Sequence, residues 1–324
     1  VLVLFAVFVF WIRRNAIKLA RFASSDLKGA PKKDANYILY FEVVLMTLFL
    51  VMNAADLHLQ QLGIGHYDKV GSFPISQFIA PLFNGMSEGI MVVIERASWW
   101  LHIIGILIFL NYLYFSKHLH ILLAFPNTFY ADLNAKGKLD NLESVTNEVK
   151  IMMDPNADPF AAPANPEAVP AKFGASDVQD LNWVQLLNAY SCTECGRCTS
   201  SCPANQTGKK LSPRKIMMDT RDRLEEVGKN IDANGGIWKD DGKSLIDNGY
   251  ISVEELRACT TCNACTDACP INIDPLSIIV ELRRFATMEE ANVPGSLNNM
   301  FGNIENNGAP WKYAPSDRLN WAKA

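Results

Sequence analysis

The 324-residue chain lacks the usual signatures of enzymes that bind nucleotides or cleave acyl bonds. It has no G-x-G-x-x-G motif opening a βα unit, no P-loop and no nucleophile elbow. Its net charge of −4 gives no basic excess of the kind that marks nucleic-acid-binding proteins. These absences argue against a nucleotide-dependent enzyme and predict no nucleic-acid partner.

Histidine is scarce and unevenly placed. None occurs after His120, and the five present are His58, His66, His102, His118 and His120. Surface histidines would be spread along the chain. This distribution therefore points to a specific role for histidine in the N-terminal part.

No cysteine lies outside two copies of one motif, C-x2-C-x2-C-x3-C-P. This is the ligand spacing of bacterial [4Fe-4S] ferredoxins, in which the fourth cysteine ligates the other cluster. The spacing therefore predicts two [4Fe-4S] clusters with crossed ligand sets. Cluster I is expected to take Cys192, Cys195, Cys198 and Cys269, and cluster II is expected to take Cys259, Cys262, Cys265 and Cys202.

Zinc sites and disulfides are the alternatives for these cysteines. Zinc is usually held by two separated pairs of ligands, so the third cysteine at the same short interval would have no role in a tetrahedral site. Disulfides do not persist in a reducing compartment, which is where the membrane topology places this region. Both alternatives are weaker than a pair of clusters.

The N-terminal part predicts a helical membrane domain. Segments 37–55 and 97–126 are apolar and long enough to cross a bilayer, and the run 1–11 is expected to end a further span in a chain truncated at its N-terminus. Segment 71–96 contains two prolines, so we expect an external loop with a short interfacial helix at 89–94.

The loop after the first apolar run sets the expected orientation. It carries seven basic residues, which are Arg13, Arg14, Lys18, Arg21, Lys28, Lys32 and Lys33. Basic residues are retained on the cytoplasmic side of the membrane. We therefore expect a multi-pass protein of the inner (cytoplasmic) membrane, with everything after Pro126 in the cytoplasm.

His102 and His120 are candidate axial ligands of b-type haem. On one continuous helix their 18-residue separation is five turns, which puts both on the same face about 27 Å apart, near the two membrane surfaces. That arrangement is expected of a cytochrome with two haems. His118 is rotated by about 160° from His102 and suits the same stack less well. The alternative is that these histidines hydrogen-bond within the bundle or anchor its interface.

The second axial ligands are less well defined. His58 and His66 lie at the outer end of the second span, so either could approach His102, although both could equally be polar residues of an external loop. Neither can reach the level of His120. At least one axial ligand is therefore expected from missing N-terminal helices or another chain.

The remaining residues predict helices rather than strands. The 56 residues between the motifs show helical periods at 212–227 and 253–258, and a further helix is expected at 274–288. The expected fold class is all-α. The expected domains are a transmembrane cytochrome b-like bundle (1–126), a linker or strap rich in proline and alanine at 154–172 (127–173), an α-helical 2[4Fe-4S] ferredoxin domain (174–291) and an irregular partner-docking tail (292–324).

Several segments together resemble a known family, the membrane-bound heterodisulfide-reductase-related iron-sulfur proteins. They are Trp100–Pro126, Phe173-Gly174-Ala175, Trp183, Ala189–Pro203, Ser212–Arg223 and Cys259–Pro270. Members of that family join a diheme cytochrome b domain, similar to the gamma subunit of respiratory nitrate reductase, to an α-helical ferredoxin domain. The resemblance implies that all eight cysteines are cluster ligands and that His102 and His120 are haem-ligand candidates.

The resemblance also implies a function. Longer relatives continue into Cys-Cys-Gly modules, whereas no cysteine follows Cys269, so a separate Cys-Cys-Gly subunit is expected. In the family, such proteins oxidise electron-transfer flavoprotein and reduce quinone, or act on lactate, glycolate or heterodisulfides. We therefore expect an electron-transfer subunit that links a cytoplasmic redox partner, through the clusters and haem b, to menaquinone in a respiratory chain.

Two other functions fit the same residues. The chain could be a non-catalytic redox anchor of a larger assembly, or electrons could flow in reverse from quinol to a cytoplasmic acceptor. No catalytic residue is identified by the sequence. Glu42, Lys117 and His118 are candidates for quinone protonation at the inner face, with ordinary interfacial roles as the alternative.

Overall fold

The computed structural model describes residues 1–22, 27–156 and 172–323. Over these ranges the chain forms helices and no strand beyond one isolated bridge between Ile246 and Ile251. The predicted all-α class is confirmed. The fold consists of two compact units, one built from residues 1–131, 190–200 and 269–273, and the other from residues 132–189, 201–268 and 274–324.

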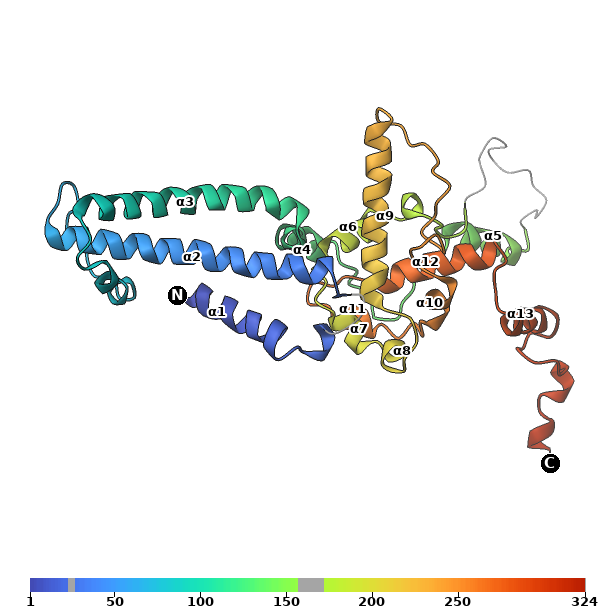
Figure 1. The fold of residues 1–324 in the computed structure, drawn as a ribbon. Helices are drawn as coiled ribbons and strands as arrows, with labels where there is room; N and C mark the ends of the chain where they lie inside the picture. Colours follow the sequence, from blue (N-terminus) through green and yellow to red (C-terminus); the bar gives the residue numbers. More distant parts are fainter. Residues whose placement is uncertain (23–26, 157–171, 324) are drawn as a thin grey trace. The chain divides into compact units, whose positions relative to one another are not determined.

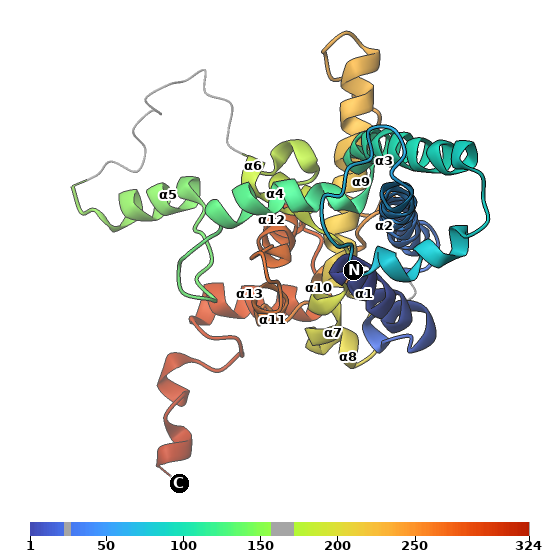
Figure 2. The same cartoon turned by 90° about the vertical axis from the view of Figure 1, so that its left-hand side faces the viewer.

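Unit 1 is built on two long antiparallel helices, α2 (Ala30–Leu62) and α3 (Glu88–Phe115). They lie side by side along most of their length, and the shorter α1 (Leu2–Trp11) packs against α2 (Figure 1 and Figure 2). Gly105 allows the close approach of α3 to α2, because a β-carbon there would lie 2.6 Å from Leu45 Cδ2. Small residues commonly permit such close packing of membrane helices.

Two helices of unit 1 are long and apolar enough to cross a membrane, at Pro31–Leu62 and Glu88–Phe115. Few of their most apolar residues are buried inside the structure, unlike those of a core helix in a soluble protein. A lipid environment would cover this exposed apolar surface.

The third apolar helix begins earlier than predicted, at Glu88 and not near residue 97. Residues 89–94 belong to α3 itself and not to a separate interfacial helix. The reason is packing, because Met91 is fully buried against the end of α2 in a cluster with Ala55 and Leu59. The loop before α3 contains only short 3-10 turns at Ser76–Phe78 and Ala80–Phe83.

The predicted continuous helix through residue 126 is wrong. α3 ends at Phe115, Ser116 is extended (φ −108°, ψ 163°), and α4 (His120–Phe129) begins after a 3-10 turn at Lys117–Leu119. The Ser116 hydroxyl accepts a hydrogen bond from the His118 amide, the local competition by which serine interrupts a helix. The helical phase that related His102 to His120 is therefore broken between them.

Unit 2 contains the predicted helices of the ferredoxin region. They are α9 (Pro213–Ala233), α10 (Val253–Ala258) and α12 (Pro275–Met288), and each is capped by a side chain, from Ser212, Ser252 and Asp274 respectively. Helices α9 and α12 pack together, and their inner faces are fully buried. Unit 2 also holds α5 (Glu143–Met153), α8 (Pro203–Gln206), α11 (Ala264–Asp267) and most of α6 (Trp183–Ser191).

The expected irregular tail contains a helix, α13 (Gly295–Asn307), so that prediction is wrong for these residues. Its amphipathic sequence carries apolar residues at helical spacing, and Gly308 ends it in the left-handed conformation. The prediction of a proline- and alanine-rich strap falls mainly on residues 157–171, which lie outside the described residues.

Candidate functional site

The two cysteine motifs share one backbone conformation. The residues two and four positions after the first cysteine are left-handed in both copies, at Glu194 and Gly196 (φ 57° and 73°) and at Thr261 and Asn263 (φ 56° and 59°). Such residues turn successive backbone N–H groups toward one side and create a concavity that suits an anion. A cluster held by four thiolates is anionic, so both loops fit it.

Gly196 is required for a second reason. A β-carbon at this position would lie 2.7 Å from the backbone oxygen of Arg21. The equivalent residue of the second motif is Asn263, which tolerates the left-handed region better than most residues. The first loop therefore depends on glycine more strictly than the second.

Backbone N–H groups donate to sulfur at equivalent positions of the two loops. The Thr261 amide donates to Cys259 Sγ at 3.4 Å, and the Glu194 amide donates to the Cys192 sulfur. Hydrogen bonds to sulfur are among the factors that set the potential of an iron-sulfur cluster. These amide hydrogen bonds favour the thiolate form and oppose the effect of burial, which raises the pKa of both sulfurs.

The eight cysteines divide equally between the two units. Unit 1 contains Cys192, Cys195, Cys198 and Cys269, whereas unit 2 contains Cys202, Cys259, Cys262 and Cys265. Within unit 1, the pKa of the Cys192 thiol is raised to about 12, mainly by burial, with Cys195 and Cys269 among the neighbours that act in the same direction. Within unit 2, burial raises the pKa of Cys259, with Cys202 and Cys262 as neighbours that act in the same direction.

A single metal ion is a poor fit to these cysteines. No group of three or more histidine, cysteine, aspartate or glutamate side chains among the described residues, which include all eight cysteines, is gathered closely enough to hold one ion. Tetrahedral zinc needs four sulfurs about 2.3 Å from one point. A [4Fe-4S] cluster instead separates its thiolates around a larger core, so its four cysteines need not converge on one point.

The two main haem candidates both use Nδ1 for a backbone hydrogen bond. His102 Nδ1 lies 2.9 Å from the Leu45 carbonyl oxygen, and His120 Nδ1 lies 2.7 Å from the Lys117 carbonyl oxygen. Metal-binding histidines commonly donate one ring N–H to a carbonyl, which orients the ring and leaves the other nitrogen for the metal. Both residues therefore fit axial ligation through Nε2.

The other three histidines have different surroundings. His66 is exposed, its Nε2 lies 2.8 Å from Arg96 Nη2, and its ring stacks on Tyr67. His58 is half-buried on α2. His118 has a buried Nδ1 atom with no hydrogen-bond partner among the described residues.

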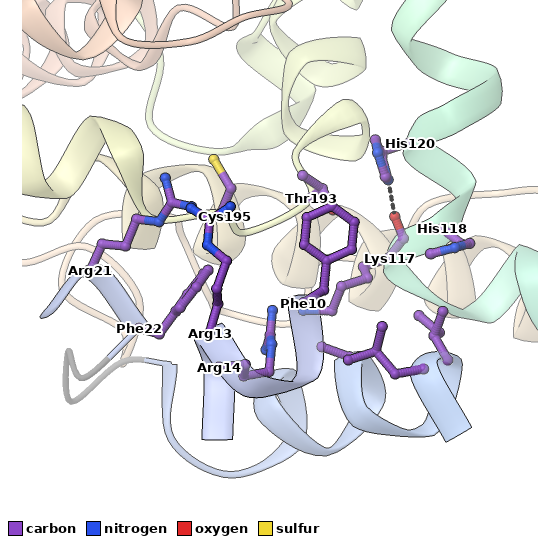
Figure 3. A pocket seen from close by; sticks show the side chains of 13 residues that line it. Phe10, Arg13, Arg14, Arg21, Phe22, Lys117, His118, His120, Thr193 and Cys195 are labelled. Atoms are coloured by element: carbon purple, nitrogen blue, oxygen red, sulfur yellow. Dashed lines mark hydrogen bonds between the residues drawn. The ribbon is translucent and has the colours of Figure 1, made fainter. Parts of the chain in front are cut away.

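His118 and His120 line a cavity of ≈ 220 Å³ that lies within unit 1 (Figure 3). Its basic residues are Arg13, Arg14, Arg21 and Lys117, and the cluster I candidate Cys195 also lines it. The sequence indicated the three arginines only as an orientation signal. Their position at one cavity with Lys117, His120 and Cys195 could not be inferred, because these segments are distant in sequence and meet only in the folded chain.

Lys117 and Glu194 form an ion pair at 3.7 Å, and their side chains are only 8% and 5% exposed. The Lys117 amide also donates to Asp34 at 3.1 Å. These contacts join the turn between α3 and α4 to the first cysteine loop. Glu42, the other candidate for quinone protonation, is on α2 and is not among the residues that line the cavity.

Comparison with known proteins agrees with this chemistry. The 4Fe-4S dicluster domain family matches residues 191–273. The "Probable iron-sulfur-binding oxidoreductase FadF" of Bacillus subtilis is 30% identical over 99% of this chain and 44% of its own length. The "EtfAB:quinone oxidoreductase" of Syntrophomonas wolfei is 27% identical over 91% of this chain and 41% of its own length.

The chain thus spans less than half the length of these two relatives. A "Probable membrane-anchored ferredoxin" of Chromohalobacter salexigens is 33% identical over 47% of this chain and 24% of its own length. Subunits C and D of Methanosarcina heterodisulfide reductases also match. No solved structure matches the chain.

The apolar helices and the membrane-anchored relative indicate association with a membrane. The two cysteine motifs lie within the matched dicluster domain. The chain therefore carries a 4Fe-4S dicluster domain and is homologous to iron-sulfur oxidoreductases and to heterodisulfide reductase subunits.

Proposed function

We propose that the chain is the electron-transfer subunit of a membrane-bound oxidoreductase that links a cytoplasmic redox partner to menaquinone. The clusters would carry single electrons when bound. The observation that carries the proposal is the division of eight cysteines into two groups of four, one of which shares unit 1 with the candidate membrane-spanning helices.

Crossed ligation is part of this proposal. Cluster I would be held by Cys192, Cys195, Cys198 and Cys269, and cluster II by Cys259, Cys262, Cys265 and Cys202. The proximity of Cys269 to Cys192, and of Cys202 to Cys259, supports it. Cluster I would then be the cluster of the membrane unit.

Two b haems are the second part of the proposed function. His102 and His120 would each supply one axial nitrogen, and the carbonyl oxygens of Leu45 and Lys117 would orient their rings. His118, His66 and His58 remain weaker candidates for further ligands. Of these, His66 is the least suited, because Arg96 engages its Nε2.

The proposed order of electron transfer rests on which cluster is exposed and on which cluster shares a unit with the membrane helices. Cys262 is exposed, so cluster II is the one that a redox partner can approach. Electrons would pass from that partner to cluster II, then to cluster I, and from there to haem and quinone. Seven basic residues within 13–33 support a cytoplasmic position for the adjoining cysteine loops of unit 1.

Electron-transfer flavoprotein, acting through a Cys-Cys-Gly subunit, is the partner we propose. The similarity to a protein named EtfAB:quinone oxidoreductase supports this choice. Reverse flow is the second candidate. Its support is the similarity to a relative named as a subunit of a dihydromethanophenazine:CoB–CoM heterodisulfide reductase.

The experiment that tests the proposal is a dithionite-minus-oxidised optical spectrum of the full chain, with pyridine-hemochrome and iron assays. About eight non-haem irons with two b haems are expected. About eight irons without haem would remove the cytochrome part. Turnover with a reduced partner and a menaquinone analogue would then separate an enzyme subunit from a non-catalytic anchor.

A further inference from the structure

The cavity in unit 1 has an apolar wall formed by several segments of the chain. Phe10 comes from α1, whereas Ala35, Ile38 and Leu39 come from α2. Phe22 completes this wall from the 3-10 turn at Ala20–Phe22. A flat apolar ring could be held against such a wall.

The cavity lining is rich in basic side chains, although one of them, Lys117, is paired with Glu194. None of the described residues that line it is acidic, whereas four are basic. The Arg14 and Arg21 guanidinium carbons each lie 4.8 Å from the centroid of the Phe22 ring. Burial lowers the pKa of Arg14, and the nearby carboxylates of Glu194 and Asp34 partly oppose this shift.

Two buried nitrogen atoms at the cavity lack a hydrogen-bond partner among the described residues. They are Nδ1 of His118 and Nε of Arg21. In the view of Figure 3, Arg21 and Cys195 lie on one side and the two histidines on the other. An unpartnered buried polar atom is costly, so a ligand with oxygen atoms on opposite sides of a ring would satisfy both.

We propose that this cavity binds the headgroup of a quinone. This inference rests on the proposed function and gives the position of its quinone-binding site. A quinone is a flat, largely apolar ring with two carbonyl oxygens. Its reduction takes up two electrons and two protons, one proton on each oxygen, and breaks no bond to carbon. The basic residues would stabilise the negative charge that develops on the oxygens before protonation.

Cys195 gives the cavity a source of electrons. As a ligand of cluster I it would bring the cluster beside the quinone, which would then take its electrons from cluster I directly. Two one-electron transfers would supply both electrons, with the cluster re-reduced by electrons from the redox partner between them. His118 Nδ1 is placed to hydrogen-bond to the nearer oxygen, and both protons would come from solvent.

An anionic phospholipid headgroup is the main competitor, because basic cavities near the cytoplasmic surface bind such lipids. The cationic residues alone would suit a phosphate. The aromatic wall of Phe10 and Phe22 and the presence of Cys195 favour a redox-active ring instead. The haem proposed on His120 would then lie outside this cavity, and a haem inside it is the other competitor for the space.

Binding of the fluorescent quinone-site ligand 2-heptyl-4-hydroxyquinoline N-oxide to the cluster-loaded full chain in detergent tests the assignment. Leu39→Trp fills the cavity, whereas Val44→Trp adds the same ring to an exposed position of α2 outside it. We expect Leu39→Trp to weaken quenching of the ligand at least about tenfold and Val44→Trp to leave it unchanged, at equal iron content.

His118→Gln is a milder variant that leaves the cavity open. We expect it to weaken binding roughly fivefold to tenfold through loss of one hydrogen bond. Arg21→Ala should weaken binding as well. Phospholipid bound to purified wild type and lost from Arg21→Ala, with unchanged ligand quenching, would instead assign the cavity to lipid.

Two further results would overturn the proposal. One is equal quenching by wild type, Leu39→Trp and His118→Gln in a protein that reduces quinone, which would place the quinone elsewhere and leave the proposed function intact. The other is loss of haem from Leu39→Trp at unchanged iron content, which would assign the space to haem. A wild-type protein that has full cofactors and a reduced partner but cannot reduce quinone would contradict the proposed function itself.

Discussion

His102 Nδ1 lies 2.9 Å from the backbone carbonyl oxygen of Leu45, a contact that joins α3 to α2 inside the candidate membrane region. The close approach at Gly105 brings the two helices near enough for this contact. A polar side chain in a membrane region is energetically costly and usually has a function. The bond fixes the ring and directs Nε2 to any ligand that it meets.

The first prediction concerns this histidine. His102→Ala should remove about one of two b haems, because an axial nitrogen is lost, and His120→Ala should remove the other. Asn111→Ala, at an exposed position of α3, is the control and should keep both. Pyridine-hemochrome content per non-haem iron is the measurement. Full haem content in both histidine variants would sink the assignment.

The second prediction distinguishes crossed from sequential cluster ligation. If ligation is crossed, Cys202→Ser and Cys259→Ser perturb one cluster, whereas Cys269→Ser and Cys192→Ser perturb the other. Electron paramagnetic resonance of the stepwise-reduced full chain should therefore sort the four variants into these two pairs. Sequential ligation would instead pair Cys202→Ser with Cys192→Ser.

The third prediction concerns Gly174, which has a φ of +74°. A β-carbon there would lie 2.3 Å from the backbone oxygen of Glu281 on α12. Gly174→Ala should therefore destabilise unit 2 by roughly 2 kcal/mol or more, through both backbone strain and the clash. Thermal unfolding of the full chain in detergent, followed by loss of cluster absorbance, measures this.

Gly208 provides the matched control for that substitution. Its φ is +82°, but a β-carbon there would meet nothing within 4 Å. Gly208→Ala should lower the free energy of unfolding by only about 1 kcal/mol, because an alanine at positive φ strains the backbone. Equal losses of stability in the two variants would show that the contact with Glu281 has no energetic role.

The fourth prediction is a pH dependence from Asp219. Burial raises the pKa of this carboxyl to about 6, although its ion pair with Lys215 at 2.6 Å opposes the shift. Since the folded-state pKa lies above the ordinary aspartate value of 3.8, the stability from its protonated form is present below about pH 3.8 and lost as pH rises through about 6.

Asp219→Asn should remove this dependence. Between pH 5 and 6 the wild type should lose stability relative to the variant by at most about 1.4 kcal/mol per pH unit. Glu225→Gln, at an exposed position of α9, is the control and should follow the wild type. Parallel thermal unfolding curves for wild type and Asp219→Asn across this range would contradict the shifted carboxyl.

The helices with strong local signals could be predicted from sequence. The serine and aspartate caps of α9, α10 and α12 precede amphipathic patterns, and local rules were sufficient there. The break at Ser116 was missed because the apolar pattern continues through it, while the contacts that fix it involve Asp34, 82 positions earlier. Tertiary contacts of this kind leave no local pattern.

The cavity was missed for the same physical reason. Arg14, Leu39, His118 and Cys195 are distant in sequence, and only the fold places them around one space. The cysteine spacing, by contrast, is a local constraint imposed by the cluster, so both motifs could be identified without coordinates. The two left-handed residues within each motif, by contrast, are seen only in the structure.

The contact between Gly196 and the Arg21 backbone makes the two cysteine loops unequal despite their common backbone conformation. They are not interchangeable parts. A chimera carrying the second loop in both places would put the asparagine side chain of residue 263 against that backbone oxygen, whereas one carrying the first loop twice would meet no such obstacle. The Arg21 backbone therefore allows exchange of the two loops in one direction only.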